Sequence, residues 1–346
     1  MLTLLDKSAP ATGRAIVMAE QFLSRHGEYA FVGARQARHS WVAYFARRHE
    51  RPLYCLKVRG TEDTAHPGRE NTSALEYEAL SWIHRHFSRV EPFQQSVPRP
   101  VAHFSECRGI LMECVSGRSL THGLLWRGNL LSAPWSTRYL RSLFRTSGAW
   151  LRVFHDADRP EWLADRTPPM EVLLSRAHTA IALSQDIVLR EMPLERLMGS
   201  VRSSFNGERH AVVSHGDYHP NNILFSDGEI RVVDLTTVAM ASAEDDLASF
   251  LVRAASPKHR VVGGQLAGTA ALWGGLAATF LAGYGYDARN AKSQLTPFLV
   301  VHFLEHLASI SYTVADLPAP LRMLLLPRIS LWAKGFASSL LQGTTF

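Results

Sequence analysis

The side chains with the clearest potential for chemistry lie in the stretch from Ser214 to Asp234. An aspartate, Asp217, is followed by Asn222 and then by a second aspartate, Asp234. Phosphoryl transfer needs such a set, because one carboxylate orients an attacking hydroxyl while an amide and a second carboxylate hold the magnesium that bridges the phosphates. Magnesium takes oxygen ligands, and only a few of them come from protein side chains. The pattern therefore indicates Asp217 as a catalytic carboxylate and Asn222 and Asp234 as Mg²⁺ ligands.

Two β-type runs are expected to position these side chains. The β-rich runs Ile223–Phe225 and Ile230–Val233 are separated by a short polar turn that contains glycine, which is typical of a β-hairpin. A hairpin brings its open ends together, so we expect Asn222 and Asp234 to lie side by side, with Asp217 on the loop just before. Each residue alone also has a structural explanation, because Asp and Asn are common in turns.

Three motifs follow one another in this region: HGDYHPNN (215–222), VVDLTT (232–237) and EDDLASF (244–250). The D-x-x-x-x-N spacing agrees with the catalytic loop of kinases, although Gly216 stands where that pattern has Arg. Together the motifs resemble the aminoglycoside phosphotransferase/choline kinase-like family of small-molecule kinases. The resemblance covers roughly Phe31 to Phe280 and is most specific in the three motifs.

This resemblance implies both a fold and a cofactor set. The fold is α+β and bilobal, as in protein kinases: a small antiparallel β-sheet N-lobe with one helix (1–116) and a mainly α-helical C-lobe (117–346). ATP is expected in the cleft between the lobes, with Mg²⁺ on its phosphates. The acceptor would be a hydroxyl of a small molecule.

In the small lobe, Lys57 interrupts the apolar run 53–58, where a buried ammonium is costly unless it is paired. It stands where kinases keep the lysine that grips the α- and β-phosphates. The alternative is an edge-strand lysine that faces water. The resemblance makes Glu76, in the predicted helix 73–87, the ion-pair partner of Lys57. Glu76 also fits a capping box with Ser73, in which its carboxylate would only bind a backbone N–H.

The resemblance also implies nucleotide contacts made by backbone groups. The strand 109–115 leads to the hinge of kinases, where the carbonyl of Glu113 and the N–H of Val115 would read adenine. A hairpin loop before Ser40 would cover the phosphates, and Ser40 is a candidate contact. The glycine-rich signature is missing there, since Gly33 stands alone, so a solvated hairpin tip is an open alternative.

Other polar residues in the motifs have structural explanations. We interpret Asp246 of the DLA element as a helix-start or scaffold carboxylate, and His155, which ends the predicted helix 137–155, as structural. His302 and His306 flank Glu305 in a literal H-x-x-E-H, the inverted zinc-protease pattern. That class needs a third ligand, a downstream glutamate, and none follows Glu305. Glu305 is instead the natural acid for an acceptor pocket.

Composition favours a cytoplasmic protein of 346 residues with no integral membrane span. Three scattered cysteines predict no disulfide framework and fit a reducing compartment. The uncharged span Val261–Tyr286 is long enough for a membrane helix but rich in glycine, so we interpret it as a buried helix. The net charge of +6 is spread along the chain without a nucleic-acid-binding signature, so no nucleic-acid partner is expected.

The charge of the C-terminal part bears on the acceptor. From Leu247 onward there are eight Lys and Arg residues against three acids, a balance of +5. The family builds its acceptor pocket in this part, and a polycation would be repelled there. We therefore expect a neutral or anionic acceptor, such as a sugar-like compound or an alcohol. An aminoglycoside kinase and a pseudokinase that only binds nucleotide as a partner protein are the alternatives.

A protein kinase is a closer rival. Only eleven residues separate Asp234 from Asp246, and no A-P-E motif follows. This leaves little room for the activation segment that binds a peptide in protein kinases. The sequence leaves the oligomeric state open.

Overall fold

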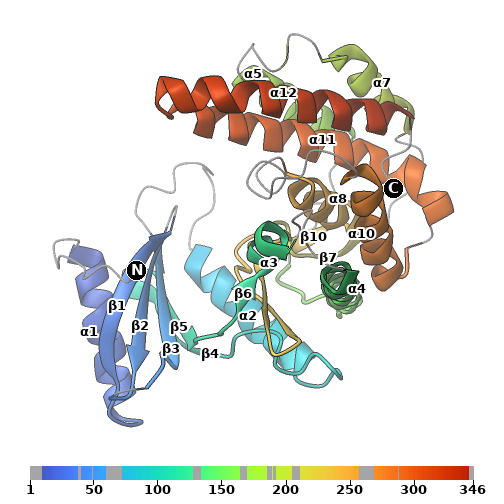
Figure 1. Cartoon of the computed structure of the whole chain (residues 1–346). Helices are drawn as coiled ribbons and strands as arrows, with labels where there is room; N and C mark the ends of the chain where they lie inside the picture. Colours follow the sequence, from blue (N-terminus) through green and yellow to red (C-terminus); the bar gives the residue numbers. More distant parts are fainter. Residues whose placement is uncertain are drawn as a thin grey trace. The chain divides into compact units, whose positions relative to one another are not determined.

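The computed structural model describes residues 10–37, 40–48, 50–59, 72–127, 134–163, 170–184, 189, 192–204, 211–256, 269–286 and 288–342. The chain divides into two compact units (Figure 1). The first unit is Met1–Gly117 with Phe225–Val238, and the second is Arg118–Leu224 with Ala239–Phe346. The second stretch of the first unit is the predicted hairpin. The division into lobes at residues 116 and 117 stays a prediction.

The first unit is built on a five-stranded antiparallel sheet. Its strands, in the order β1-β2-β3-β5-β4, are β1 (Ala30–Ala37), β2 (Ser40–Ala46), β3 (Tyr54–Arg59), β5 (Gly109–Glu113) and β4 (Pro100–Phe104). A 3₁₀ turn, η1 (Ser105–Cys107), joins β4 to β5. Sheet and helices follow the predicted element order of this part of the chain.

Two helices accompany this sheet. Helix α1 (Pro10–Ser24) packs its small apolar residues, such as Ala15 and Ala19, against Leu56 and Val58 of β3. Side chains alternate between the faces of a strand, so Lys57 points to the opposite face from these two. Helix α2 (Thr72–Phe87) contacts β4 and β5. The pleat thus explains why one lysine can interrupt an apolar run.

The hairpin joins the two units along the chain. Strand β8 (Ile223–Ser226) and strand β9 (Glu229–Val232) pair with each other. Asp227 and Gly228 form the turn with positive φ values of 52° and 85°, as hairpin turns of the primed types require. In the first unit, Val232 N–H donates to Ser96 C=O at 2.7 Å. The predicted hairpin is therefore present.

The second unit is mainly helical. Its elements are β6 (Arg118–Ser119), α3 (Leu120–Arg127), α4 (Pro134–His155), α5 (Met170–Leu183), α7 (Leu194–Ser204), β7 (Ala211–Ser214), β10 (Ala239–Ser242), α8 (Ala243–Ala254), α10 (Thr269–Tyr284), α11 (Ala288–Ala315) and α12 (Ala319–Gln342). Helix α8 is buried along most of its length and packs against α11. Strands β7 and β10 pair antiparallel. Ser214, which leads into the HGD loop, pairs with Ala239 at one end of this ladder, and Ser242 at the other end leads into α8.

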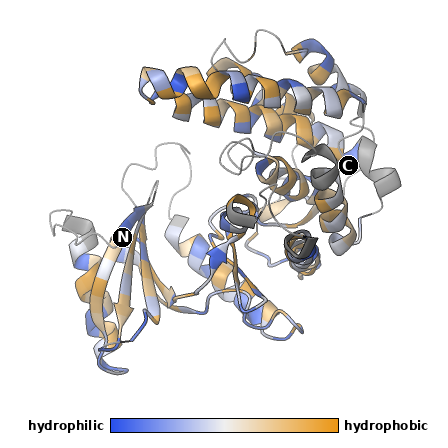
Figure 2. Ribbon diagram, in the orientation of Figure 1, coloured by the Kyte–Doolittle hydropathy of each residue, from blue (hydrophilic) through white to orange (hydrophobic). Residues whose placement is uncertain are grey.

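Among the described residues, one helix passes a length and composition test for a membrane span. It is the segment Gln294–Ala315 of α11, and 56% of its most apolar window is buried inside the protein. Figure 2 shows the described length of α11 as predominantly hydrophobic. Core helices pass the same test. The described part of the span Val261–Tyr286 forms α10, with Leu276, Phe280 and Leu281 buried.

Candidate active site

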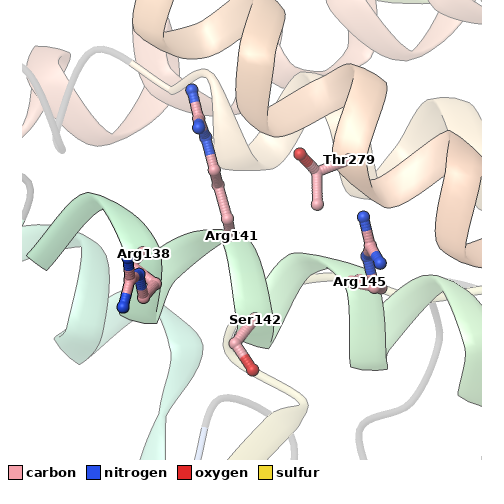
Figure 3. A pocket seen from close by; sticks show the side chains of 5 residues that line it. All are labelled: Arg138, Arg141, Ser142, Arg145 and Thr279. Atoms are coloured by element: carbon pink, nitrogen blue, oxygen red, sulfur yellow. The ribbon is translucent and has the colours of Figure 1, made fainter. Parts of the chain in front are cut away.

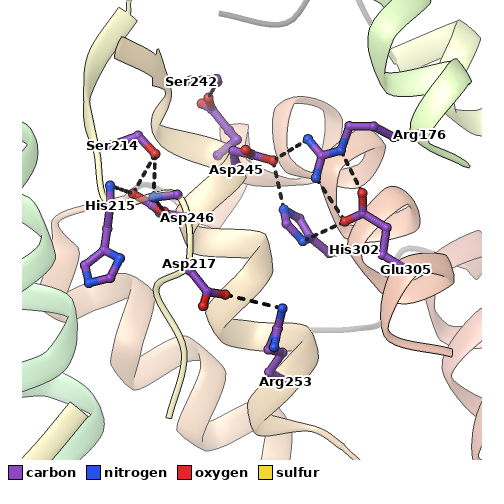
Figure 4. Close-up of polar contacts among 12 residues, drawn as sticks. Arg176, Ser214, His215, Asp217, Ser242, Asp245, Asp246, Arg253, His302 and Glu305 are labelled. Atoms are coloured by element: carbon purple, nitrogen blue, oxygen red, sulfur yellow. Dashed lines mark hydrogen bonds and ion pairs between the residues drawn. The ribbon is translucent and has the colours of Figure 1, made fainter. Parts of the chain in front are cut away.

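The HGD loop is held by the carboxylate of Asp246 on α8. This side chain is only 1% exposed and accepts backbone N–H groups from His215 at 2.7 Å and Gly216 at 2.9 Å. It also accepts the hydroxyl of Ser214 at 3.0 Å (Figure 4). His155 Nε2 lies 3.0 Å from the same carboxylate. A carboxylate that satisfies several buried donors fixes the backbone of the loop.

Gly216 is required by the shape of this loop. Its φ of 74° lies in the left-handed region, which costs a residue with a Cβ about 1–2 kcal/mol. The turn directs the N–H of Gly216 toward Asp246 and exposes the next residue, Asp217. This geometry accounts for Gly in place of the Arg of the kinase pattern.

Asp217 carries a carboxylate that is one-third exposed and ionised at neutral pH. Its Oδ2 lies 3.3 Å from His219 Nε2, and its Oδ1 lies 3.3 Å from Arg253 Nη2. Burial raises the pKa of Asp217, but the hydrogen bond from His219 and the charge of Arg253 outweigh this and lower it to about 2. A carboxylate of such low pKa is a poor base.

His219 contacts Asp217 as a neutral imidazole. Burial lowers the pKa of His219 from its ordinary value, and the nearby Asp217 only partly opposes this. Its Nδ1 accepts the N–H of Asn221 at 3.2 Å, so Nε2 carries the proton that it shares with Asp217.

Asn222 is tied to the same loop by its amide nitrogen. Nδ2 donates to the backbone carbonyl of Asp217 at 3.0 Å and lies 3.4 Å from its carboxylate. These contacts use the amide nitrogen and, within the described part of the chain, no hydrogen bond engages the amide oxygen. An amide oxygen and a carboxylate are the ligand types that Mg²⁺ prefers, so the residues fit the predicted metal.

In the first unit, Lys57 is held between two carboxylates. Its Nζ lies 2.7 Å from Glu76 Oε1 and 2.7 Å from Asp234 Oδ1. Burial lowers the pKa of Lys57, but the charges of Glu76 and Asp234 outweigh this and raise it. Arg59 Nη2 lies 3.3 Å from the other oxygen of Glu76. The ammonium therefore stays charged and fixed in place.

The carboxylate of Glu76 lies on Lys57 rather than at the start of its own helix. Only 3% of the Glu76 side chain is exposed, and the hydroxyl of Ser73 instead lies 3.1 Å from His103 Nε2. Glu76 therefore forms the ion pair with Lys57 and not the capping box with Ser73.

Asp234 has an unusual backbone for a residue other than glycine. Its φ is 69°, a conformation that costs energy and recurs at functional sites. The side chain is 39% exposed, so one oxygen pairs with Lys57 while the carboxylate remains accessible. Asn222 belongs to the second unit and Asp234 to the first. Their placement side by side stays a prediction.

The remaining candidates of the first unit lie at strand ends. Ser40 begins β2 and pairs with Ala37; residues 38 and 39 of the loop lie outside the described residues. Glu113 ends β5, where its side chain pairs with Arg99 at 2.7 Å. Val115 follows two residues later and is half-buried. The adenine contacts of Glu113 and Val115 stay a prediction.

A second polar cluster joins α5, α8 and α11 in the second unit (Figure 4). Arg176 donates to Glu305 at 2.8 and 3.0 Å and to Asp245 at 3.1 Å. His302 Nε2 lies 2.8 Å from Asp245, whereas His306 contacts Ser256 at 2.9 Å. Within the described ranges, no group of three or more His, Cys, Asp or Glu side chains could hold a metal. His302 and Glu305 therefore belong to one cluster, in which His302 Nδ1 also lies 3.4 Å from Glu305 Oε2, while His306 makes a separate contact.

Comparison with known families decides the class of the chain. A family model described as "Phosphotransferase enzyme family" matches residues 38–298. The chain belongs to this family. The predicted recognition and the predicted enzyme class, a phosphotransferase of the kinase type, are confirmed. A search among curated protein sequences gave no match.

Solved structures show the fold of this phosphotransferase. An amicoumacin kinase in complex with AMP-PNP, Ca²⁺ and Ami is 16% identical, with a TM-score of 0.57 over 98% of this chain and 97% of that one. An aminoglycoside phosphotransferase in a ternary complex with AMP-PNP and hygromycin B is 13% identical, with a TM-score of 0.57 over 93% and 97%. A choline/ethanolamine kinase family protein from Mesorhizobium loti is 13% identical, with a TM-score of 0.55 over 97% and 99%. The predicted α+β, protein-kinase-like class is confirmed.

Three arginines that contact the candidate site residues were not predicted from the sequence. Arg253 lies seven residues after Asp246, two helical turns along the same face, and this periodicity could have revealed it. Arg59 lies two residues after Lys57 on the same face of β3, which places it toward Glu76. Arg176 lies 129 residues from Glu305, and no local pattern links them.

Proposed function

We propose that this phosphotransferase transfers the γ-phosphate of ATP to a hydroxyl of a small molecule in the cytoplasm, with Mg²⁺ as the metal. The observation that carries the proposal is the ionised Asp217 carboxylate on a loop whose backbone Asp246 fixes. The free thiols Cys55, Cys107 and Cys114 agree with a reducing compartment.

Asp217 is the catalytic carboxylate of the proposed reaction. It accepts a hydrogen bond from the acceptor hydroxyl and so directs an oxygen lone pair at the γ-phosphorus. The transition state of phosphoryl transfer is loose, so positioning contributes more than early deprotonation. The pKa of about 2 keeps Asp217 ionised for this task, and the proton passes to it late as the new P–O bond forms.

Four residues are proposed to bind the phosphates of ATP and the metal: Lys57, Glu76, Asn222 and Asp234. Lys57 binds the α- and β-phosphates, and Glu76 holds its ammonium in position. Asn222 and Asp234 are the Mg²⁺ ligands. Bound Mg²⁺ neutralises the negative charge of the phosphate oxygens. The Lys57–Asp234 contact of 2.7 Å supports this assignment, because a kinase needs both groups at the phosphates.

Adenine recognition is assigned to backbone groups. The carbonyl of Glu113 accepts from the exocyclic amine, and the N–H of Val115 donates to a ring nitrogen. Ser40, at the start of β2, is assigned to the phosphates. The side chain of Glu113 is engaged with Arg99, which supports a role for its backbone rather than its carboxylate.

We further infer a neutral or anionic acceptor. Arg253 stands 3.3 Å from Asp217 and is 42% exposed, so a guanidinium accompanies the carboxylate that would meet the acceptor. Glu305, the candidate acid for a cationic substrate, is already neutralised by Arg176 at 2.8 Å. Both contacts agree with the regional balance of +5 after Leu247. A polycation is disfavoured for Coulombic reasons.

The test is a panel of hydroxyl compounds with ATP and Mg²⁺, with products identified by mass spectrometry. Neutral sugars, hydroxy acids and kanamycin-type aminoglycosides represent the three charge classes. We expect phosphorylation of a neutral or anionic compound and kcat/KM values for kanamycin lower by at least about tenfold. Efficient, saturable phosphorylation of kanamycin would establish the aminoglycoside kinase alternative instead.

Arg253→Gln sharpens this test. The variant removes the guanidinium while retaining a side chain of similar length. If Arg253 favours anions, kcat/KM should fall further for hydroxy acids than for neutral sugars, by about tenfold. An equal fall in kcat/KM for hydroxy acids and neutral sugars would mean that Arg253 positions Asp217 and does not select for anions.

A further inference from the structure

A hollow of about 370 Å³ opens on the second unit between α4 and α10. It is lined by three arginines and two hydroxyl side chains: Arg138, Arg141, Arg145, Ser142 and Thr279 (Figure 3). None of these residues belongs to the HGD loop, to α8 or to the cluster around Arg176. The volume lies within the usual range of about 300–1,000 Å³ for small-molecule sites.

The arginines share one face of α4. Positions i, i+3 and i+7 of a helix lie above one another, so Arg138, Arg141 and Arg145 follow one stripe. In Figure 3 the side chains of Arg141 and Arg145 rise from α4 toward α10, with Thr279 between them in the view. The hollow thus receives guanidinium groups from one wall and a hydroxyl from the other.

The two helices that form these walls are held at a fixed separation. A Cβ on Gly148 would lie 2.1 Å from the carbonyl oxygen of Phe280, and one on Gly283 would lie 2.2 Å from the carbonyl oxygen of Arg145. Backbone packed this closely cannot approach further or accept a side chain. The walls are therefore preorganised, which lowers the cost of binding a ligand.

Among the residues that the structure describes, the positive charge in the hollow has no acidic partner. Its lining contains no acid, and among the described residues no ion pair or side-chain hydrogen bond involves the guanidiniums of Arg138, Arg141 or Arg145. Arg152 on the same helix differs, because it pairs with Asp156 at 2.7 Å. Like charges at i+3 and i+4 destabilise a helix, so an anion bound to the stripe would relieve this repulsion.

We propose that this hollow binds a small molecule through a phosphate or diphosphate group. Guanidinium forks match phosphate oxygens in geometry and charge, and Arg141 and Arg145 are the principal contacts. Ser142 is a further donor. Thr279 already donates its hydroxyl hydrogen to Gly275 C=O at 2.6 Å, so its oxygen accepts from a hydroxyl on the ligand. A phosphate ester that retains hydroxyl groups fits both walls.

The site is independent of the proposed kinase chemistry, and the experiment keeps the two apart. Inorganic diphosphate is titrated calorimetrically into the full-length protein at physiological ionic strength, where weak surface attraction is screened. We expect saturable binding that Arg141→Gln/Arg145→Gln weakens by at least about tenfold. Lys57→Met should retain it, because Lys57 belongs to the proposed ATP site. Arg152→Gln, on the same helix but paired with Asp156, is the matched control and should also retain it.

Circular dichroism of the double variant verifies that it folds, which its exposed positions favour. Wild-type affinity in the folded double variant, or loss of binding in Lys57→Met alone, would overturn the proposal. A parallel arm uses vesicles of phosphatidylcholine with and without phosphatidylglycerol. Binding to the anionic vesicles without binding of free diphosphate would assign the arginines to a lipid surface and would equally overturn a small-molecule site.

Discussion

The carboxylate of Asp246 accepts the backbone N–H of Gly216 at 2.9 Å, which ties the interior of α8 to the loop that presents Asp217. The contact runs through backbone, so its strength depends on the charge of Asp246 rather than on the side chains of the loop. The DLA motif and the HGD motif are therefore one structural unit, although thirty positions separate these two residues.

Asp246→Asn should destabilise the protein by about 2–4 kcal/mol, because a buried carboxylate that serves several donors is replaced by an amide that must donate as well. Urea unfolding followed by circular dichroism measures this. Asp156→Asn, whose pair with Arg152 is exposed, is the control and should change the free energy of unfolding by no more than about 1 kcal/mol. Equal stability of Asp246→Asn and the wild type would refute the scaffold role.

The two proposed metal ligands should contribute unequally to Mg²⁺-dependent nucleotide binding. Asp234→Ala should abolish Mg²⁺-dependent nucleotide binding more severely than Asn222→Ala, because a carboxylate holds a hard cation better than an amide. Calorimetric titration with Mg-ATP and with metal-free ATP separates metal-dependent from metal-independent affinity. Wild-type Mg-ATP affinity in both variants would exclude these residues as ligands.

The Arg176 cluster predicts a pH-dependent contribution to stability. Burial raises the pKa values of Asp245 and Glu305, but His302 and Arg176 outweigh it for Asp245, and Arg176 does so for Glu305, so both values are lowered. Folded values below the unfolded ones of about 3.9 and 4.3 mean that the stabilisation is fully present above about pH 5 and lost as the pH falls through the folded values.

Glu305→Gln tests the predicted direction of this pH dependence. The variant should be less stable than the wild type at neutral pH by about 1 kcal/mol, a figure reduced for the partial exposure of Glu305. The difference should shrink as the pH falls through the lowered folded pKa of Glu305, because the wild-type carboxyl group then becomes protonated. Urea unfolding at a series of pH values gives the answer, with Glu229→Gln as control, because Glu229 is exposed and also pairs with an arginine, Arg231. A difference that persists or grows in acid would contradict the predicted linkage.

Contacts between residues in short sequence motifs could be predicted from the sequence. The HGD loop, the hairpin and the Lys57–Glu76 pair follow from motifs that fix short stretches of backbone. The strand periodicity could also have decided between the two explanations of Lys57, because Leu56 and Val58 are apolar and point to the face that α1 covers. Motifs and strand periodicity can be interpreted without knowledge of tertiary packing.

The remaining contacts depend on how distant helices pack. Arg176 meets Glu305 only because α5, α8 and α11 converge, and the hollow beside Arg141 exists only because Gly148 and Gly283 let α4 and α10 approach closely. The arginine stripe itself is visible in the sequence at i, i+3 and i+7, but its lack of acidic neighbours among the described residues is a property of the folded unit.

The most direct test of the account is transfer of labelled phosphate from γ-labelled ATP to the acceptor found in the panel, by the wild type and by Asp217→Asn in parallel. Asp217→Asn should lower kcat by about 10²–10⁴-fold while Mg-ATP affinity stays near that of the wild type, since Asp217 meets the acceptor and not the nucleotide. Label should appear on a hydroxyl of the small molecule with the wild type. Near-wild-type transfer by Asp217→Asn would contradict the assignment of Asp217, and nucleotide binding without transfer to any acceptor would contradict the proposed reaction.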